Sequence, residues 1–482
     1  MGKLTNIFRD TAIYGLSSII GRFLNYLLVP LYTSQLSAAS GGYGIITNIY
    51  AYVALVLVLL TFGMETTYFR FTNKTHTDSQ VVYGTTLITV GSISLLFAVL
   101  VLLFLSPISQ LMGYGEHPEY VGVMAVTVAI DAFLCIPFAH LRQQKKALKF
   151  AALKLLNIIV SIILNVIYFH YLDGKDVGYA FYINLACTVM LGVCLLTEYA
   201  GFRWVLDRRL LRIMLSYSWP ILVLGVAGIL NQTADKMLFP YIYEGSDMLE
   251  QLGIYGACSK IAMIMAMITQ AFRFAYEPIV FAGVKDKDQH EMYAKAMKYF
   301  IIFTLLAFLI VVAYMDILKY IVRNSDYWVG LKVVPIVMAA EIMMGVYFNL
   351  SFWYKVIDKT IWGAIFSGIG CAVLLMVNVI FVPKFGYMAC AWGGFAGYGV
   401  AMVISYIVGQ KYYPINYPMK EISFYVVLAF VLYGFMRTAD DWLPIVSMAF
   451  NTLLVLLFAG IIIYRDLPLG SLPVIGKYFK KK

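Results

Sequence analysis

The chain has 482 residues and a net charge of +10, and 62% of its residues are hydrophobic while only 13% are charged. Soluble domains are roughly 45–50% apolar and about 25% charged. Such a chain cannot hide its apolar surface from water, so its solvent is lipid, which excludes a soluble enzyme. In lipid every backbone amide needs an internal partner. The apolar runs are about 20 residues long and do not alternate, which favours helices over barrel strands.

Fourteen apolar spans follow one another along the chain. They cover residues 11–33, 43–64, 83–106, 120–141, 151–171, 178–199, 216–240, 253–275, 297–315, 332–354, 361–382, 387–409, 421–437 and 442–464. No cleavable signal peptide is expected, because the N-terminal segment is short and polar and the next run is long enough to span. The expected fold class is therefore an all-α polytopic membrane protein with about 14 transmembrane helices.

The Lys and Arg residues support this number and orient the chain. With a cytoplasmic N-terminus, the even-numbered connections and both termini hold 27 of the 36 basic residues, whereas the odd-numbered connections hold six. Cytoplasmic connections are the ones enriched in Lys and Arg. Both termini are therefore predicted to be cytoplasmic, and topology explains the basic charge without nucleic-acid binding.

A weak internal repeat relates the first six spans to the next six. Gly44 and Gly253 lie at the start of spans 2 and 8, and Asn165-Val-Ile in span 5 matches Asn378-Val-Ile in span 11. Six helices separate the copies, so both enter the membrane from the same side and the repeat is parallel. The alternative is chance similarity among apolar segments. The predicted domains are an N-terminal lobe of helices 1–6 (1–205), a C-terminal lobe of helices 7–12 (206–412), and helices 13–14 with a basic cytoplasmic tail (413–482).

Ionisable side chains inside the spans carry the functional signal. They are Arg22, Asp131, Asp235, Lys236, Lys260 and Glu341. A charge that faces lipid at the centre of a helix costs about 2.5–3.5 kcal/mol, so these groups must face each other or water. Helices 1, 2, 7 and 8, the pairs related by the repeat, are expected to line a central water-filled cavity between the lobes.

Two interpretations of these charges stay open. Arg22 shares a polar helix face with Asn25, and no acid lies on the same helix, which favours a substrate role. Asp235 and Lys236 are adjacent and are expected on different faces of their helix. The alternative is a structural ion pair, for instance between Asp235 and Lys260.

Asp131 and Glu341 are acids in helices 4 and 10, 210 positions apart and close to the repeat offset. An acid at this depth is costly unless it is protonated or paired. Protonation during the cycle would couple transport to a proton or cation gradient. The alternative is a fixed partner for a cavity Lys or Arg.

Signatures of enzymes and of metal sites are absent from the sequence. There is no HExxH, Walker A or GxSxG motif, and the six cysteines lie inside apolar runs without metal-ligand spacing. We expect neither catalysis nor a cofactor nor a metal. No loop is long enough for a nucleotide-binding domain, which argues against ATP-driven transport within this chain.

Several segments near the N-terminus resemble a known transporter superfamily. They are residues 10–15, 28–33, 43–45 and 63–70. With Pro30-Leu-Tyr-Thr closing helix 1 and Tyr43-Gly44 opening helix 2, the chain resembles the multidrug/oligosaccharidyl-lipid/polysaccharide (MOP) exporters. Within them it is similar to the polysaccharide-export branch, the Wzx-type O-antigen flippases.

The resemblance implies a flippase that moves a polyprenyl-diphosphate-linked oligosaccharide across the bacterial inner membrane by alternating access, for lipopolysaccharide or other surface polysaccharide biosynthesis. Its partners would be this substrate, membrane lipids, an H⁺ or Na⁺ coupling ion and a polysaccharide polymerase. A diphosphate needs cationic partners. Those expected to line the cavity with Asn25 are Arg22, Lys236, Lys260 and Arg273.

Three other functions fit parts of the sequence. A lipid II flippase would do chemically almost the same work. A cation-coupled multidrug exporter of the same superfamily would favour an acidic cavity, whereas here the acids face a comparable number of bases. A non-transporting membrane scaffold would not need charges at mid-membrane on helices related by a repeat.

Overall fold

A computed structural model describes residues 20, 24, 26–74, 78–172, 174–199, 204–282, 289–357 and 359–466. All regular elements in these ranges are helical. Thirteen of the helices there are long and apolar enough to cross a membrane. Each coincides with one of the predicted spans 2 to 14, which confirms the all-α polytopic fold. The predicted first span falls mainly outside the described residues, and α2 (Leu28–Gln35) is its described end.

The chain forms two compact units, and each is discontinuous in sequence. The first contains Met1–Lys260, Val322–Gly330 and Ile361–Gly397, and the second contains Ile261–Ile321, Leu331–Thr360 and Tyr398–Lys482. These units rest on packing, whereas the two predicted six-helix lobes rest on internal symmetry. The lobes and their boundaries therefore stay a prediction.

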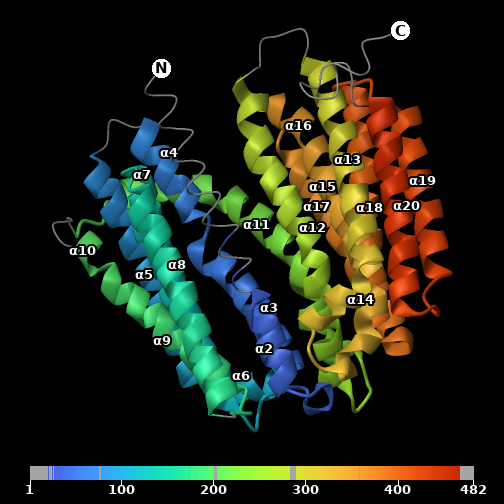
Figure 1. The fold of residues 1–482 in the computed structure, drawn as a ribbon. Helices are drawn as coiled ribbons and strands as arrows, with labels where there is room; N and C mark the ends of the chain where they lie inside the picture. Colours follow the sequence, from blue (N-terminus) through green and yellow to red (C-terminus); the bar gives the residue numbers. More distant parts are fainter. Residues whose placement is uncertain are drawn as a thin grey trace. The chain divides into compact units, whose positions relative to one another are not determined.

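The first unit holds most of the N-terminal helices (Figure 1). Its elements are α2, η1 (Ala38–Ser40), α3 (Gly42–Thr61), α4 (Met64–Lys74), α5 (Ser79–Leu103), α6 (Leu105–Leu111), α7 (Pro118–Gln143), α8 (Ala147–Val166), η2 (Ile167–Tyr171), α9 (Gly178–Cys194), α10 (Leu196–Tyr199), α11 (Arg208–Ile242), the first part of α12 (Met248–Ala282), most of η4 (Ser325–Val333), α17 (Ile361–Phe385) and the start of α18 (Tyr387–Tyr412).

Local sequence sets where these helices begin and turn. Asp78 and Asp207 accept hydrogen bonds from backbone N–H groups of the first turns of α5 and α11, as N-cap acids do. Between α3 and α4, Phe62 and Gly63 have φ angles of 51° and 65°. This left-handed pair breaks the helix, and glycine accepts such a conformation without strain.

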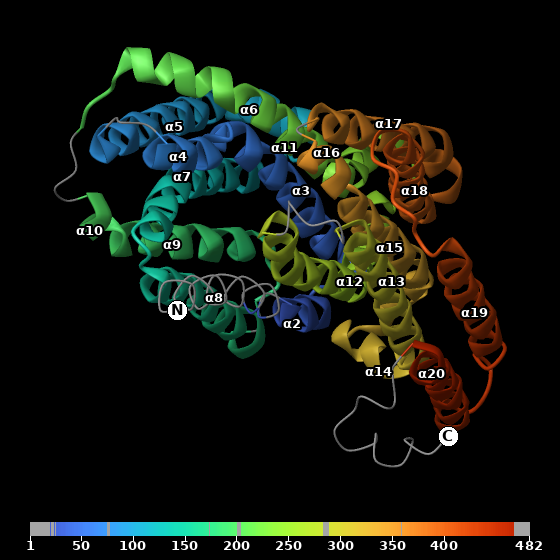
Figure 2. The same ribbon diagram turned by 90° about the horizontal axis from the view of Figure 1, so that it is seen from above.

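Helix α7 is the centre of the N-terminal part of the first unit. It packs against α5, α9 and α3 (Figure 2). Small and apolar side chains such as Ala132, Ile136 and Ala139 are completely buried there. Helix α11 packs on α3 and α17, and the Asn231 amide on α11 donates to the carbonyl of Ser367 on α17 at 2.9 Å.

The second unit is built around α13 (Gln289–Ala313). Its other elements are the rest of α12, α14 (Met315–Leu318), η3 (Lys319–Ile321), the end of η4, α15 (Val334–Leu350), α16 (Phe352–Val356), the rest of α18, α19 (Met419–Arg437) and α20 (Pro444–Asp466). On α13, Lys298 forms ion pairs with Glu421 of α19 and Asp466 of α20. These charges join the last two predicted spans to the unit.

The outward-facing surface of the helices is apolar, as lipid requires. Leu103 on α5 and Phe430 on α19 are 72% and 75% exposed, and many other leucines, isoleucines and valines are also exposed. A water-soluble monomer rarely exposes so large an apolar area. The protein is therefore a multi-pass membrane protein.

Candidate functional site

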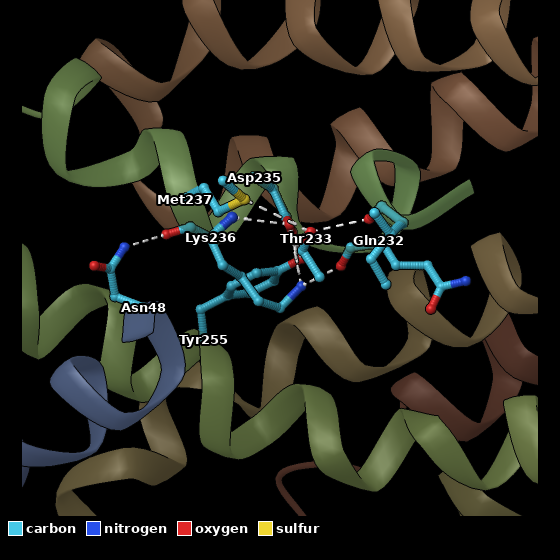
Figure 3. A network of polar contacts seen from close by, with 8 residues as sticks. Asn48, Gln232, Thr233, Asp235, Lys236, Met237 and Tyr255 are labelled. Atoms are coloured by element: carbon cyan, nitrogen blue, oxygen red, sulfur yellow. Dashed lines mark hydrogen bonds and ion pairs between the residues drawn. The ribbon is translucent and has the colours of Figure 1, made fainter. Parts of the chain in front are cut away.

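A carboxylate and an ammonium group meet inside the apolar span of α11 (Figure 3). Lys236 Nζ lies 3.1 Å from both carboxylate oxygens of Asp235, and it also donates to the Gln232 carbonyl at 3.1 Å. From α12, the Tyr255 hydroxyl donates to Asp235 Oδ2 at 2.6 Å. Asp235 is 5% exposed, so Lys236 and Tyr255 together supply the partners that a buried carboxylate needs.

This pair corrects the expectation that Asp235 and Lys236 point from different faces of their helix. Their Cα–Cβ bonds do diverge by about 100°, as in any helix. The four-carbon stem of lysine nevertheless lets the ammonium fold back onto the preceding carboxylate. Asp235 therefore pairs with Lys236 and not with Lys260.

Helix α3 holds the backbone at this point. The Asn48 amide donates to the Lys236 carbonyl at 2.8 Å, and the Tyr114 hydroxyl in turn donates to Asn48 Oδ1 at 2.8 Å. Tyr114 lies between α6 and α7, where burial raises the pKa of its hydroxyl, so the group remains a neutral donor. Two segments distant in sequence, α3 and the connection between α6 and α7, thus position one turn of α11.

Lys260 is a second lysine inside a span of the first unit. It is half-buried near the middle of its span on α12, and the Tyr26 hydroxyl donates to its backbone carbonyl at 2.5 Å. Within the described ranges, its ammonium forms neither a hydrogen bond nor an ion pair, and the charge that acts on it is that of Lys236. Two ammonium groups that repel each other and a single carboxylate leave net positive charge that could attract an anion.

A second group of polar residues lies on α7, α8 and α9, and its two charged members, Asp131 and Lys154, are half-buried. The Thr188 hydroxyl donates to Asp131 Oδ1 at 3.1 Å. The charge of Lys154 acts on Asp131, while its ammonium lies 4.1 Å from the centre of the Phe138 ring. The described residues show no direct ion pair between Asp131 and Lys154. Tyr50 on α3 is also within electrostatic reach of Asp131.

The remaining predicted site residues lie elsewhere. Arg22 and Asn25 lie outside the described residues. Arg273 and Glu341 belong to the second unit, where the Arg273 guanidinium lies 4.4 Å from the centre of the Phe348 ring and Glu341 occupies the middle of α15. The structure thus brings together Asp235, Lys236 and Lys260.

Sequence reasoning missed Tyr255 and Lys154. Tyr255 lies five residues before Lys260, and no sequence signal separates it from the other 36 tyrosines. Lys154 lies near the start of the fifth span, among the basic residues that the predicted topology assigns to the cytoplasmic side. A lysine four residues inside a predicted span, beside a helix that carries an acid, was the available signal.

Metal-binding chemistry is not suggested by the side chains that the structure describes. Among them, no group of three or more His, Cys, Asp or Glu residues could hold a metal ion.

Comparison with protein families gives one match. The family model described as "Polysaccharide biosynthesis protein" matches residues 39–324. This range includes Asp131, Lys154, Asp235, Lys236 and Lys260. No curated protein sequence matches the chain.

Solved structures share the fold at low sequence identity. An inward closed conformation of the lipid II flippase MurJ has 14% identity and a TM-score of 0.74, and the match covers 94% of this chain and 98% of that one. An inward-facing multidrug resistance MATE family transporter of the MOP superfamily has 15% identity and a TM-score of 0.63, over 83% and 94% of the two chains. An outward-facing conformation of such a MATE family transporter has 14% identity and a TM-score of 0.59, over 83% and 95%.

Proposed function

Since the chain belongs to the polysaccharide biosynthesis protein family, we propose that it is a flippase of the MOP exporter superfamily and that it moves a polyprenyl-diphosphate-linked oligosaccharide. The movement would run from the cytoplasmic to the outer face of a bacterial inner membrane. The product would serve surface polysaccharide biosynthesis, O-antigen among the candidates.

The observation that carries the proposal is the pair of lysines on α11 and α12. Lys260 places an ammonium near the middle of an apolar span, where an unpaired charge costs about 2.5–3.5 kcal/mol. Lys236 adds a second ammonium whose partner, Asp235, also has Tyr255 as a donor. An incoming diphosphate would take over Lys236, and Tyr255 would continue to satisfy Asp235.

The chemistry of the substrate fits such a site. A diphosphate carries about two negative charges, and lysine binds phosphate oxygens as a point charge. Arg22, expected on the polar face of the first helix, would add bidentate hydrogen bonds. The polyprenyl tail would stay in the lipid while alternating access carries the head group across. Coupling to an H⁺ or Na⁺ gradient is assigned to Asp131 and Glu341.

The lipid II flippase and the multidrug exporter are the alternatives. Lipid II is also a polyprenyl diphosphate and would use the same lysines, so the sugar part decides between the two flippases. A cationic drug would be repelled by Lys236 and Lys260, which disfavours drug export.

The test is a flipping assay with purified protein in vesicles. The vesicles contain a polyprenyl-diphosphate oligosaccharide, lipid II or a cationic dye, and a membrane-impermeant reagent reports which leaflet holds the sugar or which side holds the dye. We expect movement of the oligosaccharide lipid. Lys260→Met and Arg22→Ala should reduce the rate at least about tenfold, whereas Lys260→Arg and Arg22→Lys should retain part of it.

The matched control is Lys175→Met, because Lys175 is an exposed lysine of the first unit outside the spans. This variant should flip normally. Movement of lipid II alone or of the dye alone would contradict the proposed substrate, and normal flipping by folded Lys260→Met would contradict the proposed site.

In cells, deletion of the gene should cause the lipid-linked glycan to accumulate on the cytoplasmic face.

A further inference from the structure

Tyrosine rings gather where α8 ends and α9 begins. The rings of Tyr168 and Tyr179 are stacked with centroids 3.9 Å apart and an interplanar angle of 11°. Tyr182 meets Tyr179 edge-on at 5.7 Å and 88°. Tyr179 and Tyr182 are 43% and 38% exposed, so the group presents ring surface to its surroundings. Figure 1 shows these helix ends side by side near α6.

Two glycines allow the chain to fit closely around the rings. A Cβ atom on Gly174 would lie 2.3 Å from the Tyr168 ring, and one on Gly178 would lie 2.7 Å from the ring of Tyr120. Real Cβ contacts are not this short, so a larger residue at either place would displace a ring. The tyrosine rings are therefore held in a fixed arrangement.

Two carboxylates border the rings. Asp176 Oδ1 accepts from the Tyr120 hydroxyl at 3.1 Å and from the Gly178 N–H at 2.8 Å. Glu119 Oε1 lies 2.9 Å from His117 Nδ1. In the part of the chain that the structure describes, Asp176 Oδ2 and Glu119 Oε2 form no hydrogen bond. The charges of both acids act on Tyr182, so both acids lie within electrostatic reach of this exposed ring.

We propose that this surface, formed by Glu119, Tyr168, Asp176, Tyr179 and Tyr182 and here called the tyrosine platform, binds a sugar of the translocated glycan. A pyranose has one face made of C–H bonds, which packs on an aromatic ring, and a rim of hydroxyls, which donate to carboxylates. The platform offers both kinds of partner within one unit. The choice of a glycan rests on the proposed function.

The ring arrangement favours a sugar over a cation. An aromatic cage for a cation needs rings that face one another across a gap. Here the facing rings are already in contact at 3.9 Å, and the surfaces that remain free are outer faces and edges. A membrane-interface belt also uses tyrosines, yet it requires neither stacking nor adjoining carboxylates with free oxygens.

The platform's place in the topology gives it a role distinct from that of the lysines. Its residues flank the odd-numbered connections after predicted helices 3 and 5, which are predicted to lie outside. A glycan bound there would be held after its diphosphate has crossed. Such binding would favour release of the substrate toward the outer leaflet.

The test is binding of a free glycan to the intact protein in nanodiscs by saturation-transfer NMR. The probe is the oligosaccharide repeat hydrolysed from the host cell's own surface polysaccharide. We expect transfer to pyranose C–H protons, and Tyr179→Ala and Tyr182→Ala should weaken binding about tenfold. Tyr179→Phe should bind normally, because the ring and not the hydroxyl makes the contact. Glu119→Gln, a change at a half-exposed side chain that leaves the stacked rings in place, should weaken binding several-fold.

Tyr320→Ala is the matched control, since Tyr320 is 58% exposed in another predicted outer connection. This variant should bind as the wild type does. Absence of saturation transfer from the wild-type protein to the glycan would overturn the platform. Wild-type affinity for the glycan in both Tyr179→Ala and Glu119→Gln would also overturn it. Because the probe has no lipid, the result is independent of flipping: a protein that flips but binds no glycan contradicts only the platform, and one that binds but does not flip contradicts only the proposed function.

Discussion

At the scale of single residues, the two carboxylates inside the spans of the first unit differ in their partners. Asp235 has an ammonium at 3.1 Å and a hydroxyl at 2.6 Å. Asp131 has one hydroxyl at 3.1 Å and a lysine charge further away. Asp235 is thus held by an ion pair and a hydrogen bond, whereas Asp131 has a single neutral hydrogen-bond donor. Asp131 is thus the better placed of the two for coupling.

The coupling role predicts the behaviour of neutral variants. Asp131→Asn, and Glu341→Gln in the second unit, mimic the protonated acids and should fold normally. Both should lose the dependence of flipping on the gradient, because nothing is left to protonate. The measurement is flipping in vesicles with and without an imposed pH or Na⁺ gradient.

A fixed-pair role for Asp131 would give a different result. Asp131→Asn would then leave Lys154 buried without a counter-charge, at a cost of about 1–3 kcal/mol or more. Folded yield and the melting temperature would fall, and the further change Lys154→Met would restore them. Unchanged gradient dependence in both acid variants would rule these residues out as the coupling site.

At the scale of helices, the start of α3 lies against the start of α12 at two glycines. A Cβ atom on Gly44 would lie 2.0 Å from the Leu249 carbonyl oxygen, and one on Gly253 would lie 2.9 Å from the Gly44 nitrogen. Gly44 and Gly253 are also the residues that the sequence repeat places at matching positions. Small residues that allow two backbones to approach are typical of packing between membrane helices.

This contact predicts a stability difference between glycine variants. Gly44→Ala should destabilise the protein by about 1–3 kcal/mol, because the facing obstacle is backbone and cannot turn away. Gly228→Ala on α11 is the control: a Cβ atom there meets nothing within 4 Å. It should be neutral or slightly stabilising, since alanine favours a helix more than glycine does. Thermal unfolding in detergent compares the two, and equal melting temperatures would contradict the close approach.

At the scale of the whole molecule, the orientation in the membrane remains a prediction from the basic residues. The thirteen described spans confirm the succession of helices on which that orientation depends. One span more or fewer would reverse the side of every later connection. Labelling of introduced cysteines tests the orientation directly.

Two positions are suited to this labelling. Ser40 lies before α3 and Gln144 lies between α7 and α8, and both are exposed. After replacement of the six native cysteines, Ser40→Cys should react with an impermeant thiol reagent in intact cells, and Gln144→Cys only after permeabilisation. The reverse pattern would invert the orientation, and equal labelling of both would contradict the number of spans between them.

The sequence alone was sufficient for the helical class, the positions of spans 2 to 14 and the likeness to the MOP exporters. Each span is a local property, because about 20 apolar residues must be helical in lipid whatever surrounds them. The ends of the spans are also set by the local sequence, because polar segments separate one span from the next. The sequence also places Gly44 and Gly253 at corresponding positions of the predicted repeat.

Only the tertiary structure decided which polar groups meet. Asp235 pairs with its neighbour Lys236 and with Tyr255 of another helix, and the charge of Lys154 acts on Asp131 although the position of Lys154 resembles that of a cytoplasmic lysine. The stacking of Tyr168 on Tyr179 depends on how two helices end beside each other. The physical reason is that a polar group in an apolar span takes its partner from whatever side chain the neighbouring helix presents. The rotation of each helix and the reach of its side chains are set by packing between helices, and the sequence of a single span does not encode that packing.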